Sequence, residues 1–213
     1  LVADDDGSAQ FPAGAAPRIA HLPDEWAHSR PGQRAPLWYR LRWDAAGTQP
    51  PGVLLGLYIE RACGNVEVQL NGRRLHGGGR TSDPIDADCE RPLLLALPAA
   101  LLEERGNGLD LRLAGYPIAQ VASHQRAGAL AAPLIGPYAE LHALHARTTA
   151  FKIAAPQFAA AALLSMGLVS LMLAWWQRRD SHLAWFAALA IGWAAVSSRL
   201  WWHGLGWPNF ESE

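Results

Sequence analysis

One uncharged apolar segment constrains this 213-residue chain more than any other feature. Residues 153–176 have the sequence IAAPQFAAAALLSMGLVSLMLAWW, without Asp, Glu, Lys or Arg. As a helix, the segment would be about 36 Å long at about 1.5 Å per residue, enough to cross the hydrocarbon core of a bilayer. Pro156 falls in its first turn, where a missing N–H costs little, and Trp175 and Trp176 stand where an interfacial aromatic belt is expected. We therefore predict a transmembrane helix over residues 153–176.

A second apolar segment follows a short polar turn. The turn at residues 177–181 has the sequence QRRDS, and the segment at residues 182–202 is shorter and less hydrophobic than the first. We predict a second transmembrane helix there. Because Arg178 and Arg179 lie in the turn, the positive-inside rule places the turn in the cytoplasm and residues 1–150 on the other side of the membrane.

Both ends of the sequence indicate a longer chain. Residues 1–11, LVADDDGSAQF, have neither the basic region nor the apolar region of a signal peptide. Because an exported domain needs such a peptide, we expect Leu1 to follow a cleavage site. Residues 203–213 are expected to begin an extracytoplasmic loop of a truncated chain.

The charged residues are concentrated before the apolar segments. Lys and Arg number 18 against 19 for Asp and Glu, and the near-zero net charge gives no reason to expect a nucleic-acid partner. Residues 1–150 hold 14 of the basic and 16 of the acidic residues. A segment of that length can bury its own core without a metal or a disulfide. We predict one water-soluble domain followed by membrane helices.

Alternation of apolar and polar residues predicts that this domain is built from strands. The clearest case is PLWYRLRWD at residues 36–44, which places Leu37 and Tyr39 on one face and Trp38 and Arg40 on the other. The other predicted strands are residues 52–60, 65–75, 92–98 and 108–116, with a turn of helix at residues 99–107. Asn71-Gly72 inside the third strand predicts a type I′ hairpin, because both positions need positive φ.

Short strands with Gly- and Pro-rich connections are typical of an antiparallel β-sandwich, and no helix long enough for a parallel crossover precedes residue 150. We therefore expect a mainly β fold. Residues 1–140 are assigned to the sandwich as a sensor or binding domain, and residues 141–152 to a segment that couples it to the first membrane helix.

Three aromatic residues are candidates for ligand binding. Trp26, Trp38 and Tyr58 could stack on sugar rings if they are exposed on the sandwich surface. The alternative is that they are core residues, which is common for tryptophans at strand spacing.

Cys63 and Cys89 allow one disulfide, which would suit an exported domain; two separate buried thiols are the alternative. The long loop at residues 77–92 carries four carboxylates that could collect calcium, or that simply face solvent. They are Asp83, Asp86, Asp88 and Glu90. His142 and His145 could share a helix face and bind a metal, although interfacial residues at the head of a membrane helix explain them as well. We predict no metal site.

Catalytic motifs are missing from the sequence. It contains no GxSxG, HExxH, GxxxxGK[ST] or dinucleotide fingerprint. No helix is expected after Gly77-Gly78-Gly79 that could present its amides to a phosphate. We therefore assign no catalytic residue and no cofactor to these residues.

Four phrases of the sequence resemble the amino-terminal sensor region of bacterial membrane-bound sensor histidine kinases, a group similar to the seven-transmembrane receptors with diverse intracellular signalling modules. They are HLPDEWAHSRPGQRAPLWYRLRW at residues 21–43, VEVQLNGRRL at 66–75, RPLLLALPAALLEERGNGLDLRLAG at 91–115 and IGPYAELHALHARTTAF at 135–151. The resemblance covers nearly the whole chain. The LPDxW and WYR phrases and the Asn-Gly hairpin also resemble galactose-binding-like jelly-roll modules of glycoside hydrolases.

The resemblance implies a periplasmic jelly roll, a bundle of helices in the bacterial inner membrane, and a cytoplasmic kinase region beyond Glu213. ATP and Mg would be bound only in that C-terminal region. The implied partners are the membrane, an extracytoplasmic small molecule with carbohydrates among the candidates, a second copy in a homodimer, and a response regulator. No catalytic residue is carried over to this sequence.

Three other functions stay open. The region could belong to a diguanylate cyclase, because some relatives in the resembled group end in that domain. It could instead be a membrane-tethered carbohydrate-binding module without kinase output, or a small structural subunit of a membrane complex. Fold alone does not decide among them.

Overall fold

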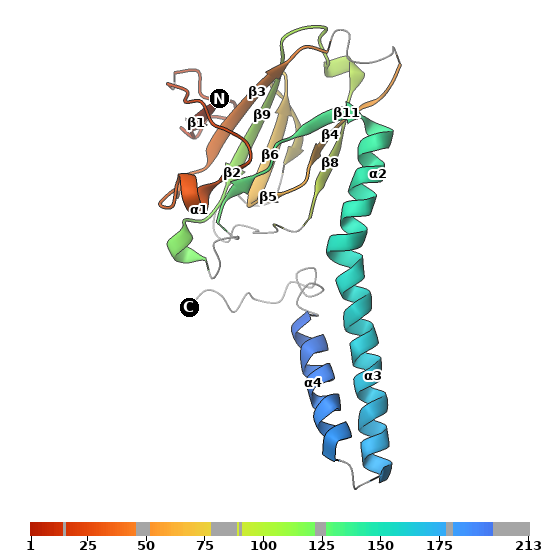
Figure 1. The fold of residues 1–213 in the computed structure, drawn as a ribbon. Helices are drawn as coiled ribbons and strands as arrows, with labels where there is room; N and C mark the ends of the chain where they lie inside the picture. The colour runs from red at the N-terminus through yellow and green to blue at the C-terminus, as the bar shows by residue number, and fades with distance from the viewer. Residues whose placement is uncertain are drawn as a thin grey trace. The chain divides into compact units, whose positions relative to one another are not determined.

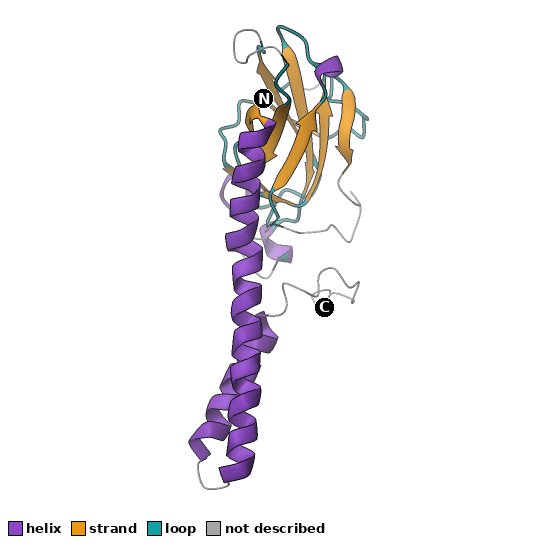
Figure 2. Ribbon diagram, turned by 90° about the vertical axis from the view of Figure 1, so that its right-hand side faces the viewer, coloured by secondary structure: helices purple, strands orange, loops and turns teal. Residues whose placement is uncertain are grey.

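The computed structural model describes residues 1–14, 16–45, 52–77, 89, 91–121, 127–177 and 181–197. The chain divides into two compact units, Leu1–Thr148 and Thr149–Glu213, here called the sandwich unit and the helical unit. Strands dominate the sandwich unit and helices make up the described part of the helical unit (Figure 2). The acidic loop candidates Asp83, Asp86, Asp88 and Glu90 lie outside the described residues.

The sandwich unit contains one five-stranded antiparallel sheet, here called sheet A, in which the central strands β3, β9 and β6 lie side by side (Figure 1). Its strands, in spatial order, are β1 Val2–Asp4, β3 Leu37–Trp43, β9 Asn107–Ala114, β6 Asn65–Leu70 and β7 Arg73–Gly77. The period-2 pattern predicted at residues 36–44 is confirmed in β3, because Leu37 and Tyr39 belong to the main core and Trp38 does not.

Two three-stranded antiparallel sheets, here called sheets B and C, complete the unit. Sheet B consists of β2 Asp24–Glu25, β10 Ala129–Leu130 and β5 Ala62–Cys63. Sheet C consists of β11 Leu134–Pro137, β4 Leu55–Ile59 and β8 Leu93–Leu97. Short helical turns lie between strands: α1 Trp26–Ser29, η1 Ala99–Leu101 and η2 Ile118–Gln120. The expectation of an antiparallel β-sandwich agrees with this arrangement.

The core is formed by alternate residues of sheet A and sheet C. β9 contributes Leu109, Leu111 and Leu113, and β4 contributes Leu55, Leu57 and Ile59. Burying a Leu or Ile side chain contributes roughly 1.5–3 kcal/mol relative to leaving it in water, so each of these six side chains stabilises the packing of the two layers. The hairpin prediction is confirmed, since Asn71 and Gly72 have φ of 49° and 76° between β6 and β7.

A long helix begins where β11 ends. Its parts are α2 Tyr138–Thr149, a π-helical turn η4 at Ala150–Ala154, and α3 Ala155–Gln177. Of the described residues, Tyr138–Trp176 form the one helix long and apolar enough to cross a membrane, by length and composition. The placement of Pro156 in a first turn was therefore wrong, because helix precedes it without a break.

The π-helical turn has a local cause. Pro156 has no N–H to donate to the carbonyl of Lys152, four residues earlier, and its ring would clash with that carbonyl in a regular α-helix. The backbone widens instead, and the Ala155 N–H donates to the Ala150 carbonyl five residues earlier. Such a turn accommodates a proline without ending the helix.

The helical unit contains a second helix, α4 Ser181–Ser197, packed against α3. Small residues make this contact. A Cβ placed on Gly167 would lie 2.8 Å from Ile191 Cγ1, and alanines of both helices are buried: Ala160, Ala187, Ala190 and Ala194. Such residues let two helices approach closely, as in membrane helix pairs. α4 covers residues 182–197 of the predicted span at 182–202, and residues 198–202 lie outside the described part.

Candidate functional site

The LPDEW phrase forms a buried hydrogen-bond chain rather than an exposed site. The Trp26 indole N–H donates to the Tyr39 hydroxyl over 2.8 Å, and that hydroxyl donates to Asp24 Oδ2, also over 2.8 Å. Asp24 also accepts from Ser29 Oγ and pairs with Arg30. Burial raises the pKa of Tyr39 well above its usual value, and the Asp24 carboxylate adds to the effect. The chain connects β2, α1 and β3, which is a structural role.

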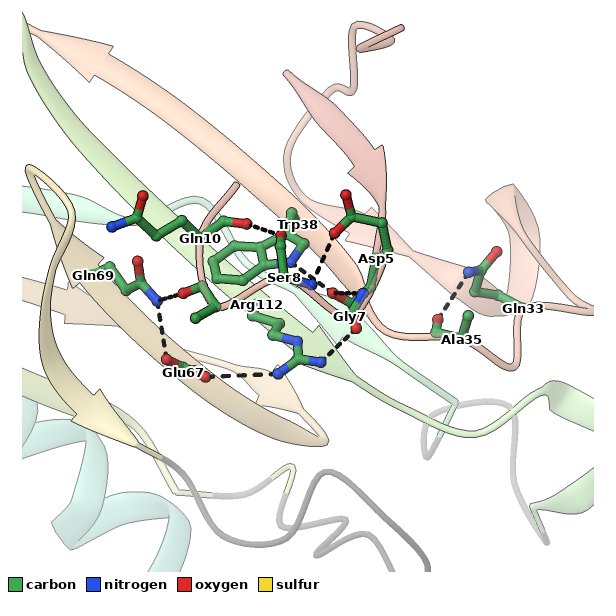
Figure 3. Close-up of polar contacts among 12 residues, drawn as sticks. Asp5, Gly7, Ser8, Gln10, Gln33, Ala35, Trp38, Glu67, Gln69 and Arg112 are labelled. Atoms are coloured by element: carbon green, nitrogen blue, oxygen red, sulfur yellow. Dashed lines mark hydrogen bonds and ion pairs between the residues drawn. The ribbon is translucent and has the colours of Figure 1, made fainter. Parts of the chain in front are cut away.

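The outer face of sheet A carries a second polar cluster, covered by residues 5–11 (Figure 3). The Trp38 indole N–H donates to Asp5 Oδ1 over 2.9 Å, and Arg112 Nη2 donates to Asp5 Oδ2 over 2.5 Å. The second terminal nitrogen of Arg112, Nη1, lies 3.9 Å from a Glu67 carboxylate oxygen. The Asp5 carboxylate is thus held by an indole and a guanidinium at once.

A second ion pair, between Arg40 and Asp110, lies next to this cluster. Arg40 donates two hydrogen bonds of 2.7 Å to the carboxylate of Asp110, and its guanidinium lies 4.2 Å from the centre of the Phe11 ring. The Asp110 hydrogen bonds raise the pKa of Arg40 above its usual value. Bidentate pairs of this kind are strong because two charge-assisted bonds form in one plane.

Helix α2 covers the outer face of sheet C along strand β4 (Figure 1). The Tyr138 N–H donates to the Leu54 carbonyl over 2.8 Å, which starts the helix at the edge of the sheet. The Tyr58 hydroxyl donates to Thr148 Oγ1 over 3.1 Å, and the Tyr58 ring meets the His145 ring edge to face. His145 Nε2 lies 3.2 Å from the Pro92 carbonyl oxygen, to which it donates.

The spacing along α2 explains the contact. Tyr138, Leu141, His145 and Thr148 recur at helical intervals of three and four residues, so they share one face of α2. Opposite them, Gly56 and Tyr58 are two residues apart in β4 and therefore share the outer face of sheet C. This arrangement extends the compact sandwich unit to Thr148, beyond the boundary expected at residue 140.

The three aromatic residues predicted to bind a ligand do not present exposed rings. Trp26, Trp38 and Tyr58 are exposed by 1%, 0% and 2% respectively. Trp26 fills space left by Gly115 and Gly128, Trp38 lies under residues 5–11, and Tyr58 lies under α2. Stacking on a sugar ring needs an open face, so this prediction is corrected to three structural roles.

The structure also shows the contacts of the cysteines and histidines that the sequence analysis considered. Cys63 and Cys89 form a disulfide, and Arg61 Nε donates to Cys63 Sγ over 3.3 Å. His142 lies against the Tyr138 ring, whereas His145 bonds to Pro92. No group of three metal-binding side chains occurs among the described residues.

Sequence reasoning missed the Asp5 cluster and the contact between α2 and β4. A run of three aspartates such as Asp4, Asp5 and Asp6 is usually exposed to solvent, yet Asp5 pairs with Arg112, which lies 107 positions away. Two residues in the sequence bear on the second contact: Leu141 is apolar, and Gly56 has no side chain that would keep a helix away from β4. They are far apart in the sequence, so no local pattern predicts that they meet.

No family model and no curated protein matches this chain. Among solved structures, it is similar to an FMN-binding β-glucuronidase from Faecalibacterium prausnitzii, with 18% identity and a TM-score of 0.43 over 59% of this chain and 20% of that one. It is also similar to a family 2 glycosyl hydrolase from Bacteroides cellulosilyticus, with 13% identity and a TM-score of 0.38 over 53% of this chain and 16% of that one.

A third similar structure is a β-D-mannosidase from Dictyoglomus thermophilum, with 16% identity and a TM-score of 0.32 over 43% of this chain and 10% of that one. The chain therefore spans a fifth or less of each of these three enzymes. Their activities are properties of those proteins.

Proposed function

We propose that the chain is the extracytoplasmic sensing and membrane-coupling region of a two-component sensor histidine kinase. The observation that carries the proposal is that the helix covering strand β4 continues through η4 into the apolar segment ending at Trp176. A change in the packing of α2 on sheet C could therefore be transmitted along one continuous helix to the apolar segment.

The contact of α2 with the sheet is of a suitable strength for such a role. It includes two side-chain hydrogen bonds, Tyr58 to Thr148 and His145 to Pro92, and the packing of Tyr138 and Leu141 over Gly56. Each hydrogen bond contributes only about 0.5–1.5 kcal/mol net. A ligand that favours one of two arrangements by about 1–3 kcal/mol could therefore shift the packing, provided that it binds the two arrangements unequally.

Residues 1–150 lie in the periplasm and the apolar helices lie in the bacterial inner membrane. The ligand is an extracytoplasmic small molecule, the protein acts as a homodimer, and its output is phosphoryl transfer to a response regulator. ATP and Mg act in a region beyond Glu213, and a diguanylate cyclase in that place is the alternative output.

The proposal is tested with two substitutions at Arg147, whose side chain is exposed on α2. Arg147→Pro removes a helical N–H and breaks α2, whereas Arg147→Ala keeps the helix. In membranes that contain the full-length gene product, we expect Arg147→Pro to change basal histidine autophosphorylation by about 5- to 150-fold. Arg147→Ala should leave it within about twofold.

Two results would contradict the proposal. One is normal autophosphorylation in the Arg147→Pro variant while circular dichroism shows that its sandwich is folded. The other is a coding sequence that ends within a few residues of Glu213, which would remove the kinase altogether. A coding sequence that continues into a diguanylate cyclase would keep the coupling and replace the output.

A further inference from the structure

We infer that the outer face of sheet A is a binding site for a small hydroxylated carboxylate, and that the side chain of Asp5 occupies the carboxylate position in this structure. The inference names a ligand class for the sensing function proposed above and rests on it in that respect. All the residues that form the proposed site belong to the sandwich unit.

The site is built from two rows of side chains that cross three strands. Strand register places Trp38, Arg112 and Glu67 in one row. It places Arg40, Asp110 and Gln69 in the next. Both rows lie on the face opposite the core, where alternation along β9 turns Asp110 and Arg112 away from the buried leucines.

The position of Asp5 defines the ligand's charged group. Its carboxylate accepts from the Trp38 indole N–H and from Arg112, and the side chain is only 6% exposed. A carboxylate so deeply buried is stable only if it is paired and hydrogen-bonded, and both partners here are donors. The site therefore selects a carboxylate by charge and by geometry.

Asp5 leaves part of the site unused. Arg112 Nε, Gln69 Oε1 and Asn65 Nδ2 are buried and have no hydrogen-bond partner among the described residues. Gln69 and Asn65 are themselves 3% and 5% exposed, and they share one face of β6 with Glu67. Because buried polar atoms are nearly always paired, this group indicates a larger polar occupant. With its carboxylate at the Asp5 position, such an occupant could accept a hydrogen bond from Arg112 Nε, and one of its hydroxyl groups could donate to Gln69 Oε1.

The segment over the site is held in a way that permits displacement. The ladder between β1 and β3 ends at Asp4, and the Asp5 N–H bonds to the Pro36 carbonyl. Beyond that point, the bonds described between residues 5–11 and the rows run through side chains: Asp5 as above, Gln69 to the Ala9 carbonyl, and Arg40 over Phe11. The carboxylate of a ligand would replace the contacts of Asp5 with Trp38 and Arg112 without unpairing a strand.

The test uses the full 213-residue chain in detergent micelles and two probes that differ in one group. D-Gluconate carries a carboxylate where D-glucitol carries a hydroxymethyl group. Asp5→Ala removes the internal carboxylate, and Asp4→Ala is the matched control, because Asp4 forms an exposed ion pair with Arg18. Binding is measured by calorimetry at constant ionic strength.

We expect Asp5→Ala to bind D-gluconate about ten- to hundredfold more tightly than the wild type or Asp4→Ala. The double variant Asp5→Ala, Arg112→Gln should lose that gain, and D-glucitol should bind to none of them. Equal D-gluconate affinity in the Asp5 and Asp4 variants would overturn the inference. So would undiminished binding after the loss of Arg112.

A second variant guards against misfolding. Asp5→Asn keeps the shape and an acceptor for Trp38 but loses the charge, and D-gluconate should raise its melting temperature more than that of the wild type. No difference between these two shifts would also contradict the inference. A negative result with D-gluconate does not affect the Arg147 test of signalling, and a negative Arg147 result does not affect the binding measurements. The carboxylate site and the kinase function can therefore be rejected separately.

Discussion

Gly56 of β4 lies directly beneath Tyr138 of α2, so closely that a Cβ on Gly56 would be 3.1 Å from Tyr138 Cδ2 and 3.3 Å from Tyr138 Cα. Its neighbour across the ladder, Gly136 of β11, has open space in the same direction. Gly56 thus permits the close contact with α2, whereas Gly136 has room for a larger side chain.

This pair makes a matched test of the helix contact. We expect Gly56→Val to push α2 away from sheet C, whereas Gly136→Val should not, because only the first side chain meets backbone and ring atoms. Hydrogen exchange should rise at the amides of residues 141–148 in the Gly56 variant alone. Unchanged exchange there would mean that α2 does not depend on this contact.

Tyr58→Phe should weaken the same contact by a smaller amount. The change removes the hydroxyl that donates to Thr148 Oγ1 but keeps the ring against His145. We expect a loss of about 0.5–1.5 kcal/mol in the free energy of unfolding, measured with urea. In a Thr148→Val background the same substitution should cost less, and equal costs in both backgrounds would rule out the hydrogen bond.

The stability of the sandwich should fall in alkaline solution because of Tyr39. Its folded-state pKa is raised by burial, so the neutral hydroxyl contributes stability that is fully present below the unfolded pKa of about 10. That stability is lost as the pH rises from there through the folded pKa.

Tyr39→Phe should separate this effect from others. The variant should lose about 1–3 kcal/mol near pH 7, because Trp26 and Asp24 each lose a partner. Its unfolding free energy should then decline less than that of the wild type above pH 10. Parallel curves for the two proteins would show that Tyr39 does not titrate as its burial implies.

The contact between α3 and α4 should depend on Gly167. Gly167→Leu places a side chain where a Cβ alone would be 2.8 Å from Ile191 Cγ1, whereas Gly192→Leu enters open space. We expect the first variant, and not the second, to need less sodium dodecyl sulfate to lose helical circular dichroism. Equal midpoints would show that the two helices do not rely on this close approach.

Local features of the sequence were sufficient to predict the elements that local physics controls. The alternation at residues 36–44 corresponds to β3, and Asn71-Gly72 corresponds to a turn with positive φ at both residues. Residues 153–176 lie within one long helix, in agreement with the helix predicted from their uncharged apolar sequence. Each of these inferences needs only neighbours within a few positions along the chain.

The candidate site was beyond such reasoning. Alternation indicates which face of a strand meets the core, but it does not indicate what covers the other face. From the sequence, Trp38 and Tyr58 could therefore be either exposed or covered by another segment. Their burial depends on Asp5 and on Thr148, which lie 33 and 90 positions away in the sequence. Pro156 likewise marks a helix start by local rules, whereas the contacts of α2 with sheet C hold a helix before it.

The sequence by itself determined the strand faces, the hairpin and the apolar helix, since these follow from side-chain period and backbone preference at adjacent residues. Only the tertiary structure decided that α2 covers β4 and that Asp5 fills the outer face of sheet A. Both depend on contacts between segments that are far apart in the sequence. The buried Asp5 carboxylate requires the Arg112 guanidinium, and the packing of α2 requires that Gly56 has no side chain.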